Sequence, residues 1–250
     1  MDLNNPETRQ DVLGTRLRHG GQIVAADVAS EFGVSLDTIR RDIIALETAG
    51  RARRVRGGAV PVLPPAPPLQ DRLAERPAIP AIAARALARL EDCATLMLDG
   101  GATVLAIAER LPPRPGRLVI TPSPWVALAC QRNGVEVFMI GGRLSASGGV
   151  NVGEDALLRM GEIRADVAVL GACALDAEYG LGADDFDESR LKQAMHDAAA
   201  STMVVTDQGK IGLAARFRAL ASGCLDLIVT DAMGPHDARF SALGVEVDYA

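Results

Sequence analysis

Apolar residues in the first sixty positions recur at helical spacing in three short segments. The segments cover residues 7–19, 24–32 and 35–50, and glycine follows or closes each of them, as is common where helices end. The second and third segments are separated by the tight turn Gly-Val-Ser, a length that suits a helix-turn-helix. The pattern therefore predicts three short helices, the last two arranged as a helix-turn-helix.

The third segment combines an apolar stripe with a polar front. Ser35 is a suitable N-cap, and the stripe consists of Leu36, Ile39, Ile43 and Leu46. At about 100° per residue, the opposite side carries Asp37, Thr38 and Arg41, with Arg40 on the flank. Such a helix can enter a major groove, where arginine reads guanine and positions phosphates.

An arginine-rich ribbon, RARRVRGG, follows this helix without a long loop. In a strand, Arg54 and Arg56 point away from the face that Val55 buries, which suits contact with phosphates, and Gly57-Gly58 predicts a sharp turn. Either half alone fits a solvated helix or a charged hairpin, but the two in order predict a winged helix-turn-helix. The predicted DNA contacts are Ser35, Asp37, Thr38, Arg40, Arg41, Arg54, Arg56, Gly57 and Gly58.

A proline-rich stretch separates this part from the rest. Residues 61–68 read PVLPPAPP, which excludes helix and central sheet. A semi-rigid linker is the favoured interpretation, and a polyproline ligand for an adaptor domain is the alternative. We predict a DNA-binding domain at 1–60, a linker at 61–77 and a second domain at 78–250, opened by an alanine-rich helix at 78–90.

In the second domain, short and nearly continuous apolar runs alternate with helical patterns. The runs cover residues 95–99, 118–121, 135–140, 165–171, 202–207, 225–231 and 245–249, and helices are predicted at 104–111 and 125–132. Runs of this kind are typical of strands covered on both faces. The alternation predicts a mostly parallel, Rossmann-like α/β sheet, so the fold class is multidomain, a winged helix-turn-helix joined to an α/β sensor domain.

Charge is divided unevenly along the chain. The net charge of −6 argues against nucleic acid, but residues 1–60 hold nine Arg and eight acids, whereas the rest holds 17 Lys or Arg and 24 acids. The two parts therefore carry +1 and −7, which keeps the positive field local.

Cysteine and histidine are scattered singly, which indicates neither a disulfide framework nor a metal site. We expect no metal and no cofactor. Because no signal peptide and no membrane-length apolar run is evident, we expect a cytoplasmic protein.

Polar residues and glycines follow several predicted strands, at the edge where open parallel sheets bind ligands. The loop after the first strand, Asp99-Gly100-Gly101-Ala102-Thr103, offers backbone N–H groups and a hydroxyl that can cradle a phosphate, although a structural turn also explains it. Glu188 and Lys192 share a helix face, and Asp207 and Lys210 follow a later strand. Each pair also fits an ordinary salt bridge, but near a phosphate loop they can hold an anion and the hydroxyls of a sugar.

These motifs resemble the DeoR family of bacterial transcriptional regulators. The resemblance rests on VSLDTIRRDIIALETAGRARRVRGGA, which contains the TIRRD core and the GGA that closes the wing, and it extends from about residue 7 to the C-terminus. It implies a sensor domain similar to ribose-5-phosphate isomerase and the CoA transferases, repression of sugar or polyol operons, and release by a phosphorylated sugar.

The match to the sensor pattern of that family is uneven. Ala102 and Val104 stand where threonines are usual, Pro122 replaces an asparagine between Thr121 and Ser123, and Gly209 replaces a serine. Glycines at 153 and 180 match. The resemblance implies effector contacts from Asp99, Gly100, Gly101, Ala102, Thr103, Thr121, Ser123, Gly141, Gly142, Glu188, Lys192, Asp207 and Lys210.

Three hypotheses follow. The leading one is a repressor that binds an operator as a homodimer or homotetramer and senses a phosphorylated sugar or polyol. The second is a sugar-phosphate isomerase or transferase with an added DNA-binding domain, in which Glu188 or Asp99 is a base beside Lys192. The third is a regulator whose pocket no longer senses phosphate, which the lost hydroxyls and amide would explain.

Overall fold

A computed structural model describes residues 3–18, 23–55, 57–61, 79–232 and 236–250. The chain forms two compact units, Met1–Pro64 with Gly212–Ala215, and Pro65–Ile211 with Arg216–Ala250. Arg56 and nearly all of the predicted linker lie outside the described residues. None of the helices in the described ranges is long and apolar enough to cross a membrane.

The first unit contains three helices and a small antiparallel sheet, which confirms the winged helix-turn-helix. Its elements are α1 (Pro6–Arg18), β1 (Ile23–Val24), α2 (Ala25–Phe32), α3 (Leu36–Thr48), β2 (Arg53–Val55) and β3 (Gly58–Val60). The strand order is β1-β3-β2, so Val24 begins no helix but pairs with Gly58. A Cβ on Gly58 would lie 1.7 Å from the Ile23 carbonyl oxygen, and the strands can therefore approach only because this residue is glycine.

The core of this unit gathers apolar residues from all three helices. Leu13 and Leu17 of α1, Val28 of α2, and Ile39 and Ile43 of α3 are buried together. The predicted stripe of α3 is wrong at one position, because the Leu36 side chain is 37% exposed. As the first residue of α3 it lies beside the wing, where packing covers it in part.

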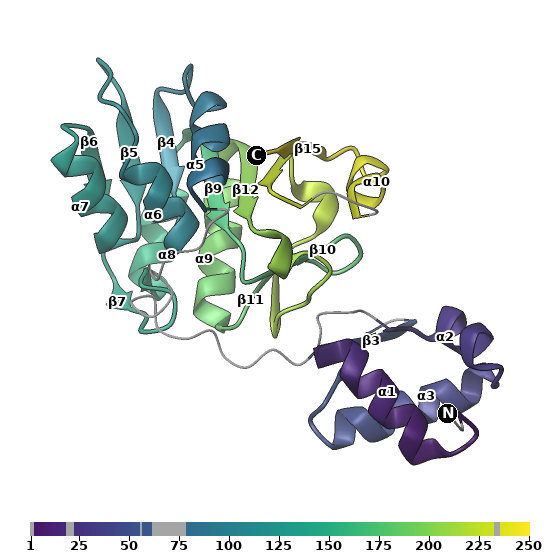
Figure 1. The fold of residues 1–250 in the computed structure, drawn as a ribbon. Coiled ribbons are helices and arrows are strands. Elements are labelled where there is room, and N and C mark those ends of the chain that lie inside the picture. The colour runs from purple at the N-terminus through teal and green to yellow at the C-terminus, as the bar shows by residue number, and fades with distance from the viewer. Residues whose placement is uncertain (1–2, 19–22, 56, 62–78, 233–235) are drawn as a thin grey trace. The chain divides into compact units, whose positions relative to one another are not determined.

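The second unit is built on a seven-stranded parallel sheet, which confirms the predicted α/β class. The order is β15-β14-β12-β9-β4-β5-β6. The strands are β4 (Thr95–Leu98), β5 (Leu118–Thr121), β6 (Glu136–Met139), β9 (Ala165–Gly171), β12 (Ala199–Thr206), β14 (Leu227–Thr230) and β15 (Glu246–Tyr249). Every neighbouring pair runs parallel, so all carboxyl ends lie along one edge (Figure 1).

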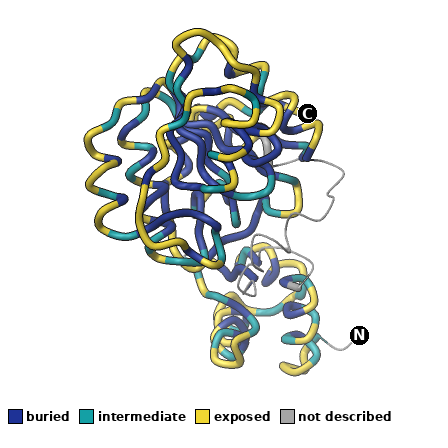
Figure 2. Tube along the Cα trace, turned by 90° about the vertical axis from the view of Figure 1, so that its left-hand side faces the viewer, coloured by how far each residue is buried: buried dark blue, intermediate teal, exposed yellow. Residues whose placement is uncertain are grey.

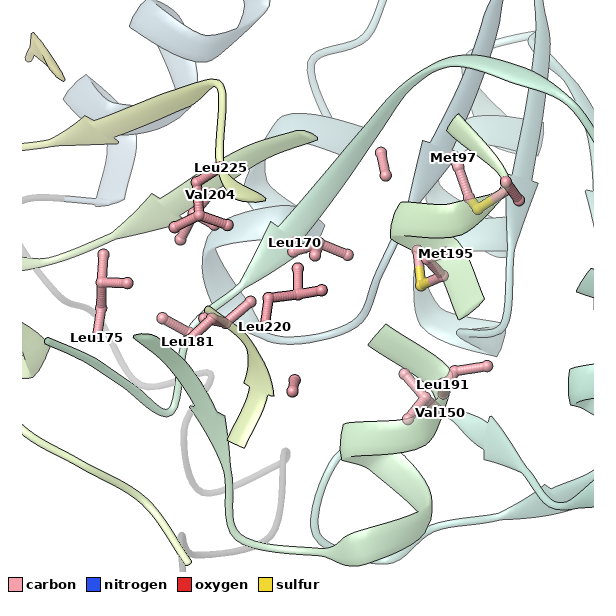
Figure 3. Packing of buried hydrophobic residues seen from close by; sticks show 14 of the residues in the cluster. Met97, Val150, Leu170, Leu175, Leu181, Leu191, Met195, Val204, Leu220 and Leu225 are labelled. Carbon is pink, nitrogen blue, oxygen red and sulfur yellow. The ribbon is translucent and has the colours of Figure 1, made fainter. Parts of the chain in front are cut away.

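Helices cover both faces of this sheet. They are α5 (Ile79–Ala88), α6 (Ala102–Ala108), α7 (Pro124–Arg132), α8 (Glu154–Gly161), α9 (Phe186–Asp197) and α10 (His236–Ser241). Residues of α5, α6 and α7 pack against Val167 and Val169 of β9. The alternate residues Ala168 and Leu170 face the other side, where α8, α9 and α10 pack. Figure 3 shows Leu170 there with Leu191 and Met195 of α9. The central strands are thus buried between two helical layers, as Figure 2 shows.

Two small antiparallel sheets complete the second unit, and the sequence pattern did not predict them. One pairs β7 (Arg143–Leu144) with β8 (Asn151–Val152). The other has the order β10-β11-β13, formed by Ala174–Asp176, Gly180–Ala183 and Phe217–Leu220. β7 and β8 have two residues each, which is too short for a clear alternation of apolar and polar positions, and two glycines weaken the strand pattern of β11.

Candidate functional site

The start of α3 is held by its own side chains. Ser35 caps the helix, because its Oγ accepts a hydrogen bond from the Thr38 backbone N–H at 3.1 Å, and the two hydroxyls lie 2.8 Å apart. Asp37 and Arg41 form an exposed ion pair one turn apart. These four predicted DNA contacts therefore lie at the surface, and in the protein alone their side chains form hydrogen bonds or ion pairs within α3.

The flank of α3 and the wing enclose a hollow of about 420 Å³. Arg40 and Arg54 line it from opposite sides, together with the first residues of α2. The wing is tethered to the helix because Glu47 accepts a hydrogen bond from the Arg54 backbone N–H at 3.1 Å and lies 3.5 Å from its Nε. Gly57 adopts a positive φ of 89°, which fits the predicted turn, whereas Gly58 is buried against β1.

A buried ion pair inside the first unit was missed by the sequence interpretation. Asp42 of α3 is 2% exposed and Arg9 of α1 is 4% exposed. Their side chains meet twice, at 2.6 Å and 3.2 Å. Gln10 also donates to Asp42 at 3.0 Å, and Arg9 donates to two backbone carbonyls near the N-terminus. Asp42, the one acid of the TIRRD segment, thus holds α1 against α3.

At the carboxyl edge of the large sheet, Asp99 and Lys192 form a second buried pair. Asp99 follows β4, Lys192 lies on α9, and their charged groups are in direct contact. The Lys192 ammonium also donates to the Gly171 carbonyl at 2.8 Å, and the Gly171 N–H donates to Asp99 at 3.1 Å. Three elements far apart in sequence therefore meet at one point.

The surroundings of Lys192 keep it charged. Burial lowers its pKa, but the charge of Asp99, its hydrogen bond to Lys192 and the charge of Glu188 outweigh burial, so the pKa lies above the ordinary value. A lysine with a raised pKa is protonated at neutral pH. It therefore acts here as a cation and a hydrogen-bond donor.

Glu188 lies one turn before Lys192 and is wrapped by a serine- and glycine-rich turn. Its Oε1 accepts hydrogen bonds from Ser145 at 2.6 Å and from Ser147 at 2.8 Å. A Cβ on Gly148 would approach the Glu188 carboxylate to 2.4 Å, so a larger residue there would displace this carboxylate. The sequence interpretation missed this turn, although its repeated serines and glycines directly follow Gly141-Gly142 and could have marked it.

Thr121 and Ser123 also lie at this edge, but both are fully buried. The Thr121 hydroxyl accepts a hydrogen bond from the Ser123 N–H at 3.1 Å, and the Ser123 hydroxyl donates to the Gly149 carbonyl at 3.1 Å. Through this bond to Gly149, Ser123 helps to hold the turn at Ser145–Gly149 that contacts Glu188. Gly142 immediately precedes β7, its φ is 145°, and a Cβ would lie 2.7 Å from the Val152 carbonyl oxygen. Gly141 beside it is exposed.

The predicted phosphate loop connects β4 to α6. Gly101 has a φ of 101° and precedes the helix without a side-chain cap. Gly100 packs so closely that a Cβ would lie 2.4 Å from Val150. Thr103 is buried, whereas Gly101 and Ala102 are partly exposed. The loop thus places backbone groups next to Asp99 and against the same Ser145–Val150 segment.

Asp207 and Lys210 follow another strand of the sheet, β12. They pair with each other at 3.4 Å, and Asp207 caps a short 3₁₀ helix (Gln208–Lys210). Asp207 follows β12, which β9 separates from β4, a distance of about 10 Å across two strand spacings. No group of three or more acidic, histidine or cysteine side chains in the described part of the chain could hold a metal ion.

Comparisons with known proteins agree with this arrangement of units. A model of the DeoR C terminal sensor domain matches residues 80–232, and a model of the DeoR-like helix-turn-helix domain matches residues 9–62. The chain belongs to the DeoR family. The resemblance inferred from the TIRRD and GGA segments is therefore confirmed.

Relatives of this DeoR-family chain include named regulators. HTH-type transcriptional regulator GlpR of Haloferax volcanii is 32% identical over 215 residues, covering 85% of this chain and 84% of that protein. Glycerol-3-phosphate regulon repressor of Escherichia coli (strain K12) is 28% identical over 222 residues and covers 88% of each. Among solved structures, D-ribose-5-phosphate isomerase in complex with phospho-erythronic acid has a TM-score of 0.39 at 17% identity, covering 53% of this chain and 52% of that one.

Proposed function

We propose that this DeoR-family chain is a sequence-specific DNA-binding repressor of a sugar or polyol catabolic operon. The observation that carries the proposal is the exposed set of arginines, Arg40 and Arg41 on α3 and Arg54 on the wing. The names of its relatives, a glycerol-3-phosphate regulon repressor among them, support the class of operon. A gel shift on the region upstream of the chain's own gene tests it, and absence of binding at low salt would overturn it.

Base reading and phosphate contact are assigned to different arginines. We expect Arg41→Ala to relax base preference and cost about 1 to 3 kcal/mol of binding free energy, because arginine contacts base edges in the major groove. Arg54→Ala should weaken all sequences alike and flatten the salt dependence. Fluorescence anisotropy on operator and mutated operator over a salt series measures both. The reverse pattern would assign base reading to the wing.

We propose that a phosphorylated sugar or polyol binds at the carboxyl edge of the large sheet and relieves repression. The inner cluster holds two carboxylates, Asp99 and Glu188, and one ammonium, Lys192, so its formal charge is −1. Such a cluster favours hydroxyl groups over a phosphate dianion. We therefore assign the hydroxyls of the effector to this cluster, and its phosphoryl group to backbone N–H groups of Gly100–Thr103.

Effector binding should stabilise the protein. A ligand at 100 times its dissociation constant adds about 2.7 kcal/mol to the unfolding free energy of the state it binds. A thermal-shift screen over phosphorylated sugars and polyols, with the unphosphorylated compounds as controls, measures this. If no compound raises the melting temperature, the hypothesis of a pocket that no longer senses phosphate replaces the present one.

We propose that the second unit senses its ligand without turning it over. Asp99 accepts a hydrogen bond from the charged Lys192, and Glu188 accepts hydrogen bonds from two serine hydroxyls. Both carboxylates that could act as a base are therefore already bonded to protein groups. A general base must be able to accept a proton from the substrate. Turnover of ribose 5-phosphate by the purified protein, abolished in Lys192→Ala, would restore the enzyme hypothesis.

A further inference from the structure

One large aliphatic side chain of α3 is not used by the packing of the winged unit. Ile44 is 45% exposed, and among the described residues the core of this unit takes Ile39, Ile43 and Leu46 from α3 but not Ile44. Because isoleucine is branched at Cβ, it also favours a helix less than leucine or alanine does. Neither burial nor helix stability therefore accounts for an isoleucine at this position.

Ile44 shares a face of α3 with two of the predicted DNA contacts. At about 100° per residue, Ile44 lies roughly 20° from Asp37 and roughly 60° from Arg41 around the helix axis. Leu36, the other exposed large aliphatic side chain of α3, lies roughly 80° from Ile44, toward the flank of the helix. The face that presents Arg41 to solvent therefore also presents an aliphatic surface.

The surroundings of Ile44 combine apolar and cationic groups. Ile44 lines the hollow between α3 and the wing, and Arg40 and Arg54 line the same hollow. The major groove of DNA has the complementary chemistry, because thymine places a C5-methyl group among the base edges and rows of phosphates run along the groove. An apolar protein surface would leave the two guanidinium groups without anions. The charge of the lining thus favours duplex DNA as the occupant.

We propose that Ile44 is a specificity-determining residue that contacts the C5-methyl group of a thymine in the operator. The inference rests on the proposed function, since it requires α3 to lie in the major groove. Three residues of helix rise about 4.5 Å, and successive bases of one strand are about 3.4 Å apart. The thymine is therefore expected within two base pairs of the base that Arg41 contacts.

Replacing thymine by uracil tests this contact, because the replacement removes the C5-methyl group and keeps base pairing and phosphates. The region upstream of the chain's own gene is amplified once with dTTP and once with dUTP, and fluorescence anisotropy measures the affinity of the full-length protein for both probes. Wild type should prefer the thymine probe by about fourfold for each methyl group that Ile44 buries. In Ile44→Ala this preference should be lost.

The comparison between variants separates the methyl contact from other effects of uracil. A change in DNA stiffness alters the affinity of every variant alike, so the informative quantity is the thymine-to-uracil affinity ratio of wild type divided by that of Ile44→Ala. Leu36→Ala is the matched control, because Leu36 is 37% exposed and lines the same hollow but lies off the face of Arg41. It should keep the wild-type ratio.

The outcomes distinguish the inference from the proposed function. Equal ratios in wild type and Ile44→Ala, or loss of the preference in Leu36→Ala, would overturn the inference while the regulator still binds DNA. A lower urea midpoint of Ile44→Ala, followed by circular dichroism, would assign Ile44 to folding and also overturn it. Absence of wild-type binding to the thymine probe at low salt would contradict the proposed function, and the inference with it.

Discussion

Lys192→Met is expected to abolish the response to effector while operator binding remains. The substitution removes the ammonium from a buried cluster and leaves the Asp99 carboxylate without its cation. Removing one partner of a buried ion pair typically costs about 3 to 5 kcal/mol, so the second unit should also lose stability. Its single tryptophan, Trp125, makes urea unfolding of that unit measurable by fluorescence.

A double variant separates stability from recognition. Asp99→Asn with Lys192→Met replaces the ion pair by neutral groups of similar size, and the amide oxygen can still accept the Gly171 N–H. We expect this variant to recover most of the lost stability and to remain unresponsive to effector in a gel shift titration. Restored response would mean that Lys192 serves folding alone. Loss of operator binding in a well-folded Lys192→Met protein would contradict the division between the two units.

The large sheet could be predicted from sequence because its strands are nearly continuous apolar runs. The run at 165–171 coincides with β9, and the run at 118–121 coincides with β5. A strand buried on both faces carries this signal within its own residues. The small sheets carry none, because β7 and β8 have two residues each. Their pairing depends on the surrounding turn.

The sequence could predict those parts of the candidate sites whose residues are neighbours along one helix or loop. Glu188 and Lys192 share a helix face because they are one turn apart, and this could be read directly. The contacts of Glu188 with Ser145 and Ser147 join residues 43 and 41 positions apart, and no local pattern encodes them. Thr121 and Ser123 were expected to offer hydroxyls to the effector, which stays a prediction. In the structure both side chains are buried, and their hydroxyls form hydrogen bonds with backbone groups.

The same limit explains the Arg9–Asp42 pair in the winged unit. The two residues are 33 positions apart, and Asp42 stands beside arginines in a segment that otherwise suggests DNA contact. A helix wheel shows only that Asp42 lies near the apolar stripe. In the structure, Asp42 is buried and accepts two hydrogen bonds from the Arg9 guanidinium, so it stabilises the fold of this unit.

Asp42→Ala is expected to unfold the winged unit selectively. It leaves the buried Arg9 guanidinium without a counter-charge, which should cost about 3 to 5 kcal/mol. Domains of about sixty residues are marginally stable, so this loss should suffice to abolish operator binding at 37 °C. Part of the helical circular dichroism should then disappear at low urea, while the Trp125 fluorescence transition of the second unit stays unchanged.

Asp37→Ala is the matched control, because it removes an aspartate–arginine pair from the same helix. The Asp37 and Arg41 side chains are 64% and 79% exposed, and exposed pairs one turn apart contribute about 0.5 kcal/mol or less. The first unfolding transition should therefore hardly move in Asp37→Ala. Equal stability losses in the two variants would show that burial does not determine the contribution of Asp42. A wild-type urea midpoint in Asp42→Ala with weakened operator binding would instead assign Asp42 to DNA recognition.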